Sequence, residues 1–256
     1  MKQQTKKCNV KSGNNTIYVE IEYPEKLPAS AVILAHGLRS YFPGFLNNFA
    51  KKLRDAGYIS VKFHFVGTGK SSGKFEDKTA SEMLQNYKDV LEFVKKQPEV
   101  LDIAVVGRSN AGSTVAAYGP DPRIKAYALL APPAFLGVVM EKFVKSATIK
   151  GKFFYHSSFK RPHTKGEGRL PIDFVKKNLL YDRLIAEKIG KIKNVILFQG
   201  TEDESVKLEE GHFDFWKKGL PQPNKFVVIE NSRHSFPGKH NFVITETIKW
   251  FQKYLV

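Results

Sequence analysis

The sequence predicts one α/β domain, spanning residues 1–256, with a largely parallel central sheet. Strand-like and helix-like segments alternate along the whole chain, which is typical of a layered α/β fold. Residues 31–35, AVILA, are continuously apolar, as in a strand that is covered on both faces. The chain contains neither an internal repeat nor a low-complexity segment that would divide it.

The remaining strands are predicted from short apolar runs. Two segments, 16–23 and 58–65, alternate apolar and polar residues, which indicates half-exposed strands. Four more apolar runs complete the series, at 103–106, 126–130, 195–198 and 226–229.

Three amphipathic helices are predicted between and after these strands. The first has an apolar stripe from Phe45 to Ala56 and ends at Gly57. Thr79 and Glu82 have the spacing of a capping box and open the second. The last helix carries Ile244, Ile248, Phe251 and Leu255 on one face.

Residues 134–190 interrupt this alternation. They lie between two strand signals and are too long for an ordinary connection. Aromatic residues flank a polar centre, HTKGEGRLP. We expect an inserted lid with short helices rather than a second domain.

Composition narrows the function classes. The net charge is +16, but the lysines are scattered over the expected helices and join no nucleic-acid-binding motif, which favours a solvated surface over nucleic-acid binding. An attraction for anionic substrates or surfaces is the alternative. The single cysteine, Cys8, excludes an internal disulfide, and no window has the ~18 apolar residues of a membrane span. The basic start lacks a secretory apolar region, so we expect a cytoplasmic protein. No cofactor or metal is expected, and a homodimer is an open alternative.

The stretch AVVGRSNAGS places Ser109 directly after an apolar strand and before a helix-compatible run. A sharp strand-to-helix turn exposes such a serine at the sheet edge, next to a helix N-terminus that supplies a free N–H. So tight a turn needs small neighbours, and Gly107, Ala111 and Gly112 meet that need. A serine nucleophile also requires a base and two oxyanion donors.

Three other strand ends supply the missing groups. Leu38 follows the strand at 31–35 in the run HGL, where its N–H could be an oxyanion donor. Asp203 follows the strand at 195–198, and His234 lies between the last strand and the last helix. The chain order Ser109, Asp203, His234 is that of a Ser–acid–His hydrolase.

Competing residues exist for the acid and the base. Glu202 and Glu204 flank Asp203 and are the alternatives for the acid. We expect His36 to brace the oxyanion loop and His212 to lie on a helix surface. The other histidines are His64, His156, His163 and His240, of which His156 and His163 fall in the expected lid.

These residues resemble the α/β-hydrolase family of serine hydrolases over residues 15–255. The stretch FHFVGTGKSSGKFEDKT, residues 63–79, is most similar to the cinnamoyl- and feruloyl-esterase-like carboxylesterases, which carry a lid after the sixth strand. The resemblance implies Ser109 as nucleophile, His234 as base and Asp203 as its orienting acid, with the N–H groups of Leu38 and Asn110 as the oxyanion hole. The elbow departs from the usual H-S-x-G-G, because it reads R-S-N-A-G.

The predicted function is therefore a carboxylesterase that cleaves small or medium carboxylic esters through an acyl-enzyme. A small peptidase or amidase and a thioesterase use the same triad and are the alternatives among enzymes. From another class, a hydrolase-fold binding protein without catalysis is the alternative.

Overall fold

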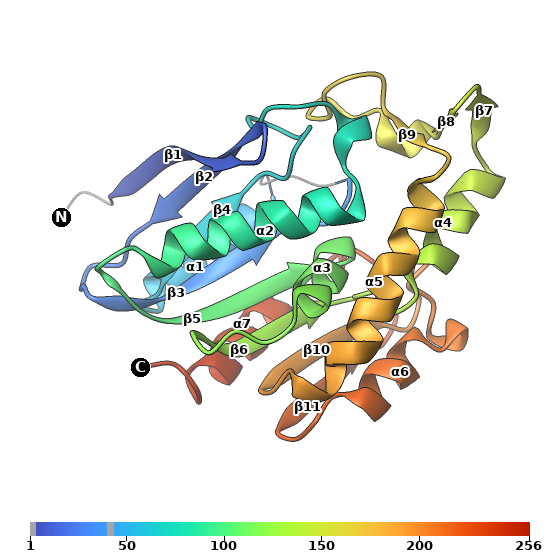
Figure 1. The fold of residues 1–256 in the computed structure, drawn as a ribbon. Coiled ribbons are helices and arrows are strands. Elements are labelled where there is room, and N and C mark those ends of the chain that lie inside the picture. The colour runs from blue at the N-terminus through green and yellow to red at the C-terminus, as the bar shows by residue number, and fades with distance from the viewer. Residues whose placement is uncertain (1–3, 40–43) are drawn as a thin grey trace.

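A computed structural model describes residues 4–39 and 44–256, and a twisted sheet runs through its middle (Figure 1). This sheet has eight strands. The strand order is β1-β2-β4-β3-β5-β6-β10-β11. β1 and β4 pair antiparallel with β2, and the other neighbours are parallel, which confirms the predicted mostly parallel sheet. The strands are β1 (Thr5–Ser12), β2 (Asn15–Glu22), β3 (Ala29–Ala35), β4 (Ile59–Phe63), β5 (Val100–Arg108), β6 (Ile124–Leu130), β10 (Val195–Gly200) and β11 (Asn224–Ile229).

Helices cover both faces of the sheet. Alternate residues of the central strands face two separate apolar clusters, because side chains alternate along a strand. One cluster packs the sheet against α1 and α7, and the other packs it against α2 and α3. The helices are α1 (Phe45–Asp55), α2 (Ala80–Lys95), α3 (Asn110–Tyr118), α4 (Leu136–Lys145), α5 (Phe174–Lys188), α6 (His212–Gly219) and α7 (His240–Phe251). The 3₁₀ turns are η1 (Phe75–Asp77), η2 (Ser157–Phe159), η3 (Ile189–Lys191) and η4 (Leu208–Glu210).

Strand β1 was not predicted from the sequence. It lies at the edge of the sheet, and only Val10 and Ser12 of its residues are buried. Lysines on its exposed positions keep an edge strand from pairing with another chain. An edge strand thus needs few apolar residues, and its sequence carries almost no strand signal.

Strand β4 differs from its predicted half-exposed character, because all five of its residues are buried. Lys62 is only 2 % exposed in its side chain, and its ammonium forms ion pairs with Glu20 at 2.9 Å and Glu22 at 2.8 Å. The polar positions of the alternating pattern thus face the interior, where carboxylates from β2 neutralise the lysine.

The segment between β6 and β10 occupies the right-hand side of Figure 1. It contains α4, α5 and a small antiparallel sheet of β7 (Thr148–Lys150), β8 (Phe153–Tyr155) and β9 (Arg169–Pro171). Instead of only short helices, α5 runs for 15 residues against α3. Three-residue strands are too short to show a periodicity, so the sequence did not reveal the small sheet.

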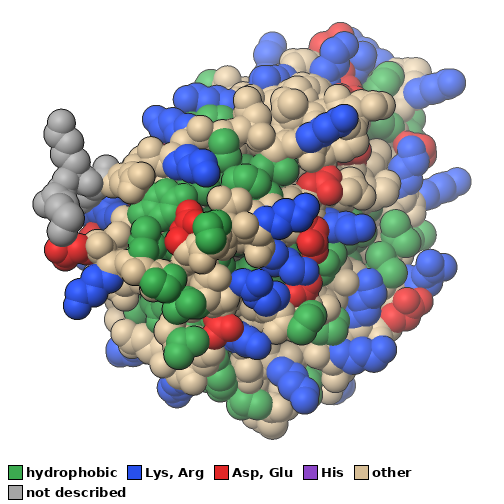
Figure 2. Space-filling model, turned by 60° about the vertical axis from the view of Figure 1, so that its left-hand side comes forward, with side chains coloured by type: hydrophobic (Ala, Val, Ile, Leu, Met, Phe, Trp, Pro, Cys, Tyr) green, Lys and Arg blue, Asp and Glu red, His purple; other side chains and the backbone are tan. Residues whose placement is uncertain are grey.

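The charged surface agrees with the scattered lysines of the sequence. Figure 2 shows Lys and Arg spread over one face of the molecule, with acidic and apolar side chains between them. None of the helices in the described part of the chain has both the length and the apolar character that crossing a bilayer requires.

Candidate active site

The turn from β5 into α3 holds Ser109 in a strained conformation. Its φ of 52° and ψ of −128° lie in a region that side-chain-bearing residues rarely adopt. The neighbouring backbone is packed very closely, since a Cβ added at Gly107 would lie 2.8 Å from the Cα of Gly112. A Cβ on Gly112 would lie 2.8 Å from Pro132. The small residues therefore allow the turn that lifts the serine hydroxyl out of the backbone.

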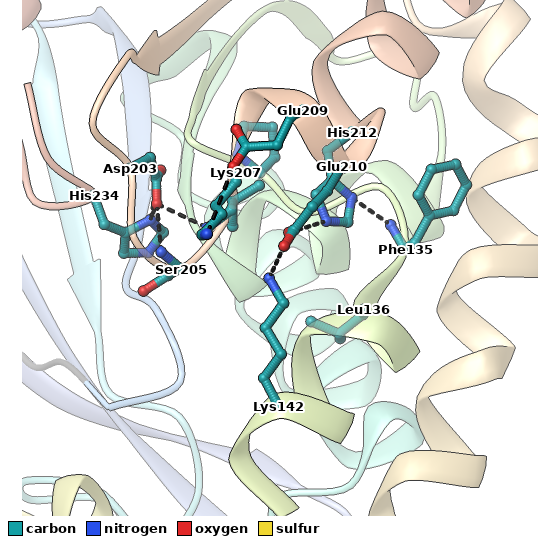
Figure 3. Close-up of polar contacts among 12 residues, drawn as sticks. Phe135, Leu136, Lys142, Asp203, Ser205, Lys207, Glu209, Glu210, His212 and His234 are labelled. Carbon is teal, nitrogen blue, oxygen red and sulfur yellow. Dashed lines mark hydrogen bonds and ion pairs between the residues drawn. The ribbon is translucent and has the colours of Figure 1, made fainter. Parts of the chain in front are cut away.

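The structure brings Ser109, His234 and Asp203 together beyond the ends of three strands. The Oγ of Ser109 lies 2.9 Å from Nε2 of His234. On the other side of the ring, Nδ1 lies 2.8 Å from Oδ2 and 3.0 Å from Oδ1 of Asp203 (Figure 3). An ionised carboxylate only accepts hydrogen bonds, so Nδ1 carries the proton and Nε2 is left to accept the one from the serine.

Further donors fix the Asp203 carboxylate. Its Oδ1 accepts the backbone N–H groups of Ser205 at 2.9 Å and Val206 at 2.8 Å. Its Oδ2 accepts from the side-chain amide of Gln199 at 3.0 Å. Burial raises the pKa of Asp203, but the hydrogen bond and charge of His234 and the two N–H donors outweigh it, so the pKa is lowered. The lowered pKa favours an ionised carboxylate beside the His234 ring.

The alternative acids lie elsewhere. Glu204 is exposed, and its Oε2 accepts the backbone N–H of His234 at 3.2 Å instead of contacting the ring. Its carboxylate also lies 3.6 Å from Nε of Arg233. Glu202 is exposed on the same loop. Of the three candidate acids, Asp203 is the one whose carboxylate meets the imidazole.

The loop after β3 is held in place from two sides. The Nε2 of His36 accepts the N–H of Phe65 at 3.1 Å, so its Nδ1 is protonated and donates to the Gly37 carbonyl at 2.8 Å. That carbonyl and the N–H of Leu38 belong to one planar peptide, so His36 fixes the direction of the N–H. Lys78 donates its ammonium to the Leu38 carbonyl at 2.9 Å.

Lys78 was not identified from the sequence. It lies in the GKFEDKT segment, and its side chain is fully buried. Burial lowers the pKa of Lys78 to about 7. A neutral amine donates hydrogen bonds as an ammonium does, so the contact with Leu38 survives loss of the proton. A sequence pattern does not reveal this burial, because lysine usually lies on the surface.

The rest of the segment 63–79 joins the domain to the insertion. The N–H of Gly69 donates to the His163 carbonyl at 2.8 Å, and the N–H of Lys165 donates to the Gly67 carbonyl at 3.1 Å. A Cβ at Gly67 would lie 2.1 Å from the Lys74 carbonyl, so only glycine allows this approach. This glycine-rich loop thus positions the insertion against the sheet.

His212 does not lie on a helix surface as predicted. It is 1 % exposed, and its Nδ1 accepts the N–H of Phe135 at 3.2 Å. Glu210 faces its other nitrogen and also binds Lys142 of α4 (Figure 3). The first turn of α6 packs inward onto the insertion, a contact that no local sequence pattern indicates.

A cavity of about 480 Å³ opens over Ser109, within the usual size of a small-molecule site. Leu38 and Asn110, the predicted oxyanion residues, line it together with Ser109 and His234. One wall comes from the insertion and consists mainly of apolar α4 residues, namely Leu136, Val139, Met140 and Phe143. Three arginines also line it, namely Arg39, Arg108 and Arg161, and only Arg108 was singled out from the sequence.

Comparison with known proteins identifies the family of this chain. Residues 26–189, well over half of the chain, match the family described as serine aminopeptidase, S33. The chain belongs to this family. It is therefore a serine hydrolase of the α/β-hydrolase type. Among curated proteins, no sequence matches it.

Solved structures share the fold over nearly the whole chain. Est1E from Butyrivibrio proteoclasticus, determined with ferulic acid bound, is 20% identical with a TM-score of 0.77, covering 96% of this chain and 98% of Est1E. An esterase domain from Rhodothermus marinus is 18% identical with a TM-score of 0.74, covering 98% and 99%. A dienelactone hydrolase from Anabaena variabilis is 15% identical with a TM-score of 0.68 and full coverage of both chains. These likenesses confirm the predicted α/β-hydrolase fold.

Proposed function

We propose that the protein is a carboxylesterase that cleaves small or medium carboxylic esters through an acyl-enzyme on Ser109. The observation that carries this proposal is the continuous hydrogen-bonded line from the Ser109 hydroxyl through the His234 ring to the buried Asp203 carboxylate. A serine held this way can lose its proton as it attacks a carbonyl carbon.

The reaction proceeds in two halves. As Ser109 Oγ attacks, His234 Nε2 takes its proton, and the carbonyl oxygen becomes an oxyanion next to the N–H groups of Leu38 and Asn110. The protonated ring then gives the proton to the leaving alcohol, and the acyl group stays on Ser109. A water molecule repeats the attack with the same base and releases the acid. Residues 134–190 serve as the lid, since their α4 wall excludes water from one side of the cavity.

The family description supports a second candidate, an aminopeptidase with the same triad. Such an enzyme must bind the positively charged N-terminus of a peptide. Among the described residues that line the cavity, Glu204 is the one acid, and three arginines stand against it. This charge opposes a cationic substrate, so the ester reading is the better supported. A thioesterase with the same triad is an outcome of the test.

The test is a substrate panel of 4-nitrophenyl butyrate, alanine 4-nitroanilide and butyryl-coenzyme A, with wild type and Ser109→Ala. We expect the ester to turn over fastest and Ser109→Ala to lower kcat by roughly 10⁴- to 10⁶-fold. A fluorophosphonate probe should label wild type and the control Ser235→Ala, whose serine lines the same cavity, but not Ser109→Ala.

Two results would overturn the proposal. If the anilide or the thioester has the highest kcat/KM, the enzyme is a peptidase or a thioesterase. If no substrate turns over and Ser109 is not labelled, the chain is a hydrolase-fold protein without this chemistry.

A further inference from the structure

The cavity over Ser109 concentrates positive charge. Arg39 follows β3, Arg108 precedes the serine, and Arg161 comes from the insertion, so three distant parts of the chain each contribute one guanidinium. Glu204 is the single acid among the described residues that line this cavity, which leaves an excess of two positive charges. His163 also lines it, and burial lowers the pKa of His163, so the ring is neutral near pH 7. The cations on the face shown in Figure 2, in contrast, are interspersed with acids.

The arginines repel one another at this place. Burial lowers the pKa of Arg108, and the charge of Arg39 lowers it further against the attraction of Asp203. Burial likewise lowers the pKa of Arg39, with repulsion from Arg161 added and attraction from Glu204 opposing it. Arginine keeps its proton at neutral pH all the same. A bound anion would convert this repulsion into attraction.

Arg39 and Arg161 are available to a ligand. In the described part of the chain, neither forms an ion pair with a carboxylate of the protein. The guanidinium of Arg39 lies over the ring of Phe143 at 5.2 Å, which fixes its plane at the cavity wall. Arg161 donates Nε to the Ser158 carbonyl at 3.1 Å, so its terminal nitrogens are left for another acceptor.

Another part of the cavity lining is apolar. Leu136, Val139 and Met140 of α4 are buried apolar residues that line the same cavity. A substrate that matches both the arginines and these apolar residues has an anionic part and an apolar part, joined near the carbonyl that Ser109 attacks.

We propose that the cavity selects esters that carry an anionic oxygen group, a carboxylate or a phosphate, which binds at Arg39, Arg108 and Arg161. This inference rests on the proposed esterase function. It assigns the three arginines to substrate selection, and it explains why the elbow carries arginine directly before the serine.

The test compares two esters of matched shape, mono-4-nitrophenyl glutarate and the neutral 4-nitrophenyl glutaramate. We expect wild type to favour the anionic ester in kcat/KM by roughly 10- to 100-fold, as for a hydrogen-bonded charge pair. Arg39→Gln and Arg161→Gln should each lower that ratio, and the double variant, which keeps only Arg108 of the three, should lower it further than either single variant. Lys160→Gln removes the same charge from an exposed position that does not line the cavity, so its ratio should stay at the wild-type value.

Competition distinguishes the two kinds of anion. Glutarate and butyl phosphate are titrated against turnover of 4-nitrophenyl butyrate, and the stronger inhibitor identifies the group that the site takes. Inhibition by neither, or a substrate ratio near one in wild type while both esters turn over, would overturn the inference and leave the esterase function intact.

Binding to Ser109→Ala tests the site without any turnover. Calorimetry should show saturable binding of monomethyl glutarate to Ser109→Ala. The triple variant Ser109→Ala, Arg39→Gln, Arg161→Gln should bind it more weakly. The neutral methyl glutaramate should bind more weakly than the acid. Equal binding of the acid and the amide would overturn the anion site, whichever reaction the protein catalyses.

Discussion

Two buried histidines pair with acids in the region that Figure 3 shows, and they differ in what their second nitrogen meets. His234 has Asp203 at Nδ1 and the hydroxyl of Ser109 at Nε2. His212 accepts a backbone N–H at Nδ1 and has Glu210 at 3.5 Å from Nε2. The first ring can accept the proton of the Ser109 hydroxyl at Nε2 while Asp203 holds its Nδ1–H, whereas both nitrogens of the second ring have structural partners.

The same comparison separates the roles of the acids. Burial raises the pKa of both Asp203 and Glu210, and hydrogen bonds outweigh it in both, so both carboxylates have a lowered pKa. The donors differ, because those of Asp203 include the imidazole and those of Glu210 begin with the ammonium of Lys142. A His–acid pair with a perturbed pKa is thus no sufficient sign of catalysis. A hydroxyl on the far side of the ring is the distinguishing feature.

The largest expected difference is in activity. Asp203→Asn leaves the shape of the site but favours the wrong tautomer of His234, so kcat for 4-nitrophenyl butyrate should fall by roughly 10⁴-fold. Glu210→Gln removes the matching charge from the other pair and should change kcat by less than about threefold, because no reacting atom contacts it. A large loss in Glu210→Gln with a small one in Asp203→Asn would reverse the assignment of the two pairs.

The sequence was sufficient to predict that Ser109, His234 and Asp203 lie together, which is the first half of this comparison. Ser109, Asp203 and His234 each follow a strand with a clear apolar pattern, and parallel strands bring their carboxyl ends to one edge. His212 could not be predicted in the same way. It opens a short helix, and its burial depends on Phe135 and Glu210, whose proximity no local pattern encodes.

The cavity was beyond prediction for a similar reason. Its lining combines residues that are far apart in the sequence, such as Arg161 of the insertion and Arg39 after β3, and no local pattern predicts that they meet. Two lysines that the sequence would place on the surface are buried instead. Lys62 is buried against Glu22 of β2, and Lys78 is buried against the Leu38 carbonyl, and both partners come from other parts of the chain.

The second prediction concerns stability, which should depend more on His212 than on His234. His212→Leu removes the acceptor of the Phe135 N–H and should lower the free energy of unfolding by about 1–3 kcal/mol. Its kcat should stay close to the wild-type value, because His212 contacts no reacting atom. His234→Gln should do the opposite, abolishing turnover with a smaller change in stability, because its Nε2 faces the open cavity. Urea unfolding and ester turnover on both variants check this, and equal stability losses would contradict the distinction.

The smallest expected effect is in the acid dependence of stability. A carboxylate with a lowered folded pKa stabilises the fold fully above its unfolded pKa, which is 3.8 for Asp203 and 4.5 for Glu210. As the pH falls, the unfolded chain binds the proton before the folded chain does, because its pKa is higher. The contribution to stability therefore declines and is lost once the pH has fallen through the folded pKa. The stability gap between wild type and Glu210→Gln should therefore shrink from pH 6 toward pH 3, and so should the gap for Asp203→Asn.

Salt then separates the two acids. The ion pair of Glu210 with Lys142 is partly exposed, so 1 M NaCl screens it and should narrow the Glu210→Gln gap already at pH 6. Asp203 has a fully buried side chain, and its partners His234, Ser205 and Val206 bind it out of reach of mobile ions. Its gap at pH 6 should therefore be the same at 0.05 M and 1 M NaCl. Urea unfolding of wild type and both variants at pH 6 and at both salt concentrations tests this. Equal salt sensitivity of the two gaps would mean that solvent reaches the Asp203 pair and that its burial does not set it apart.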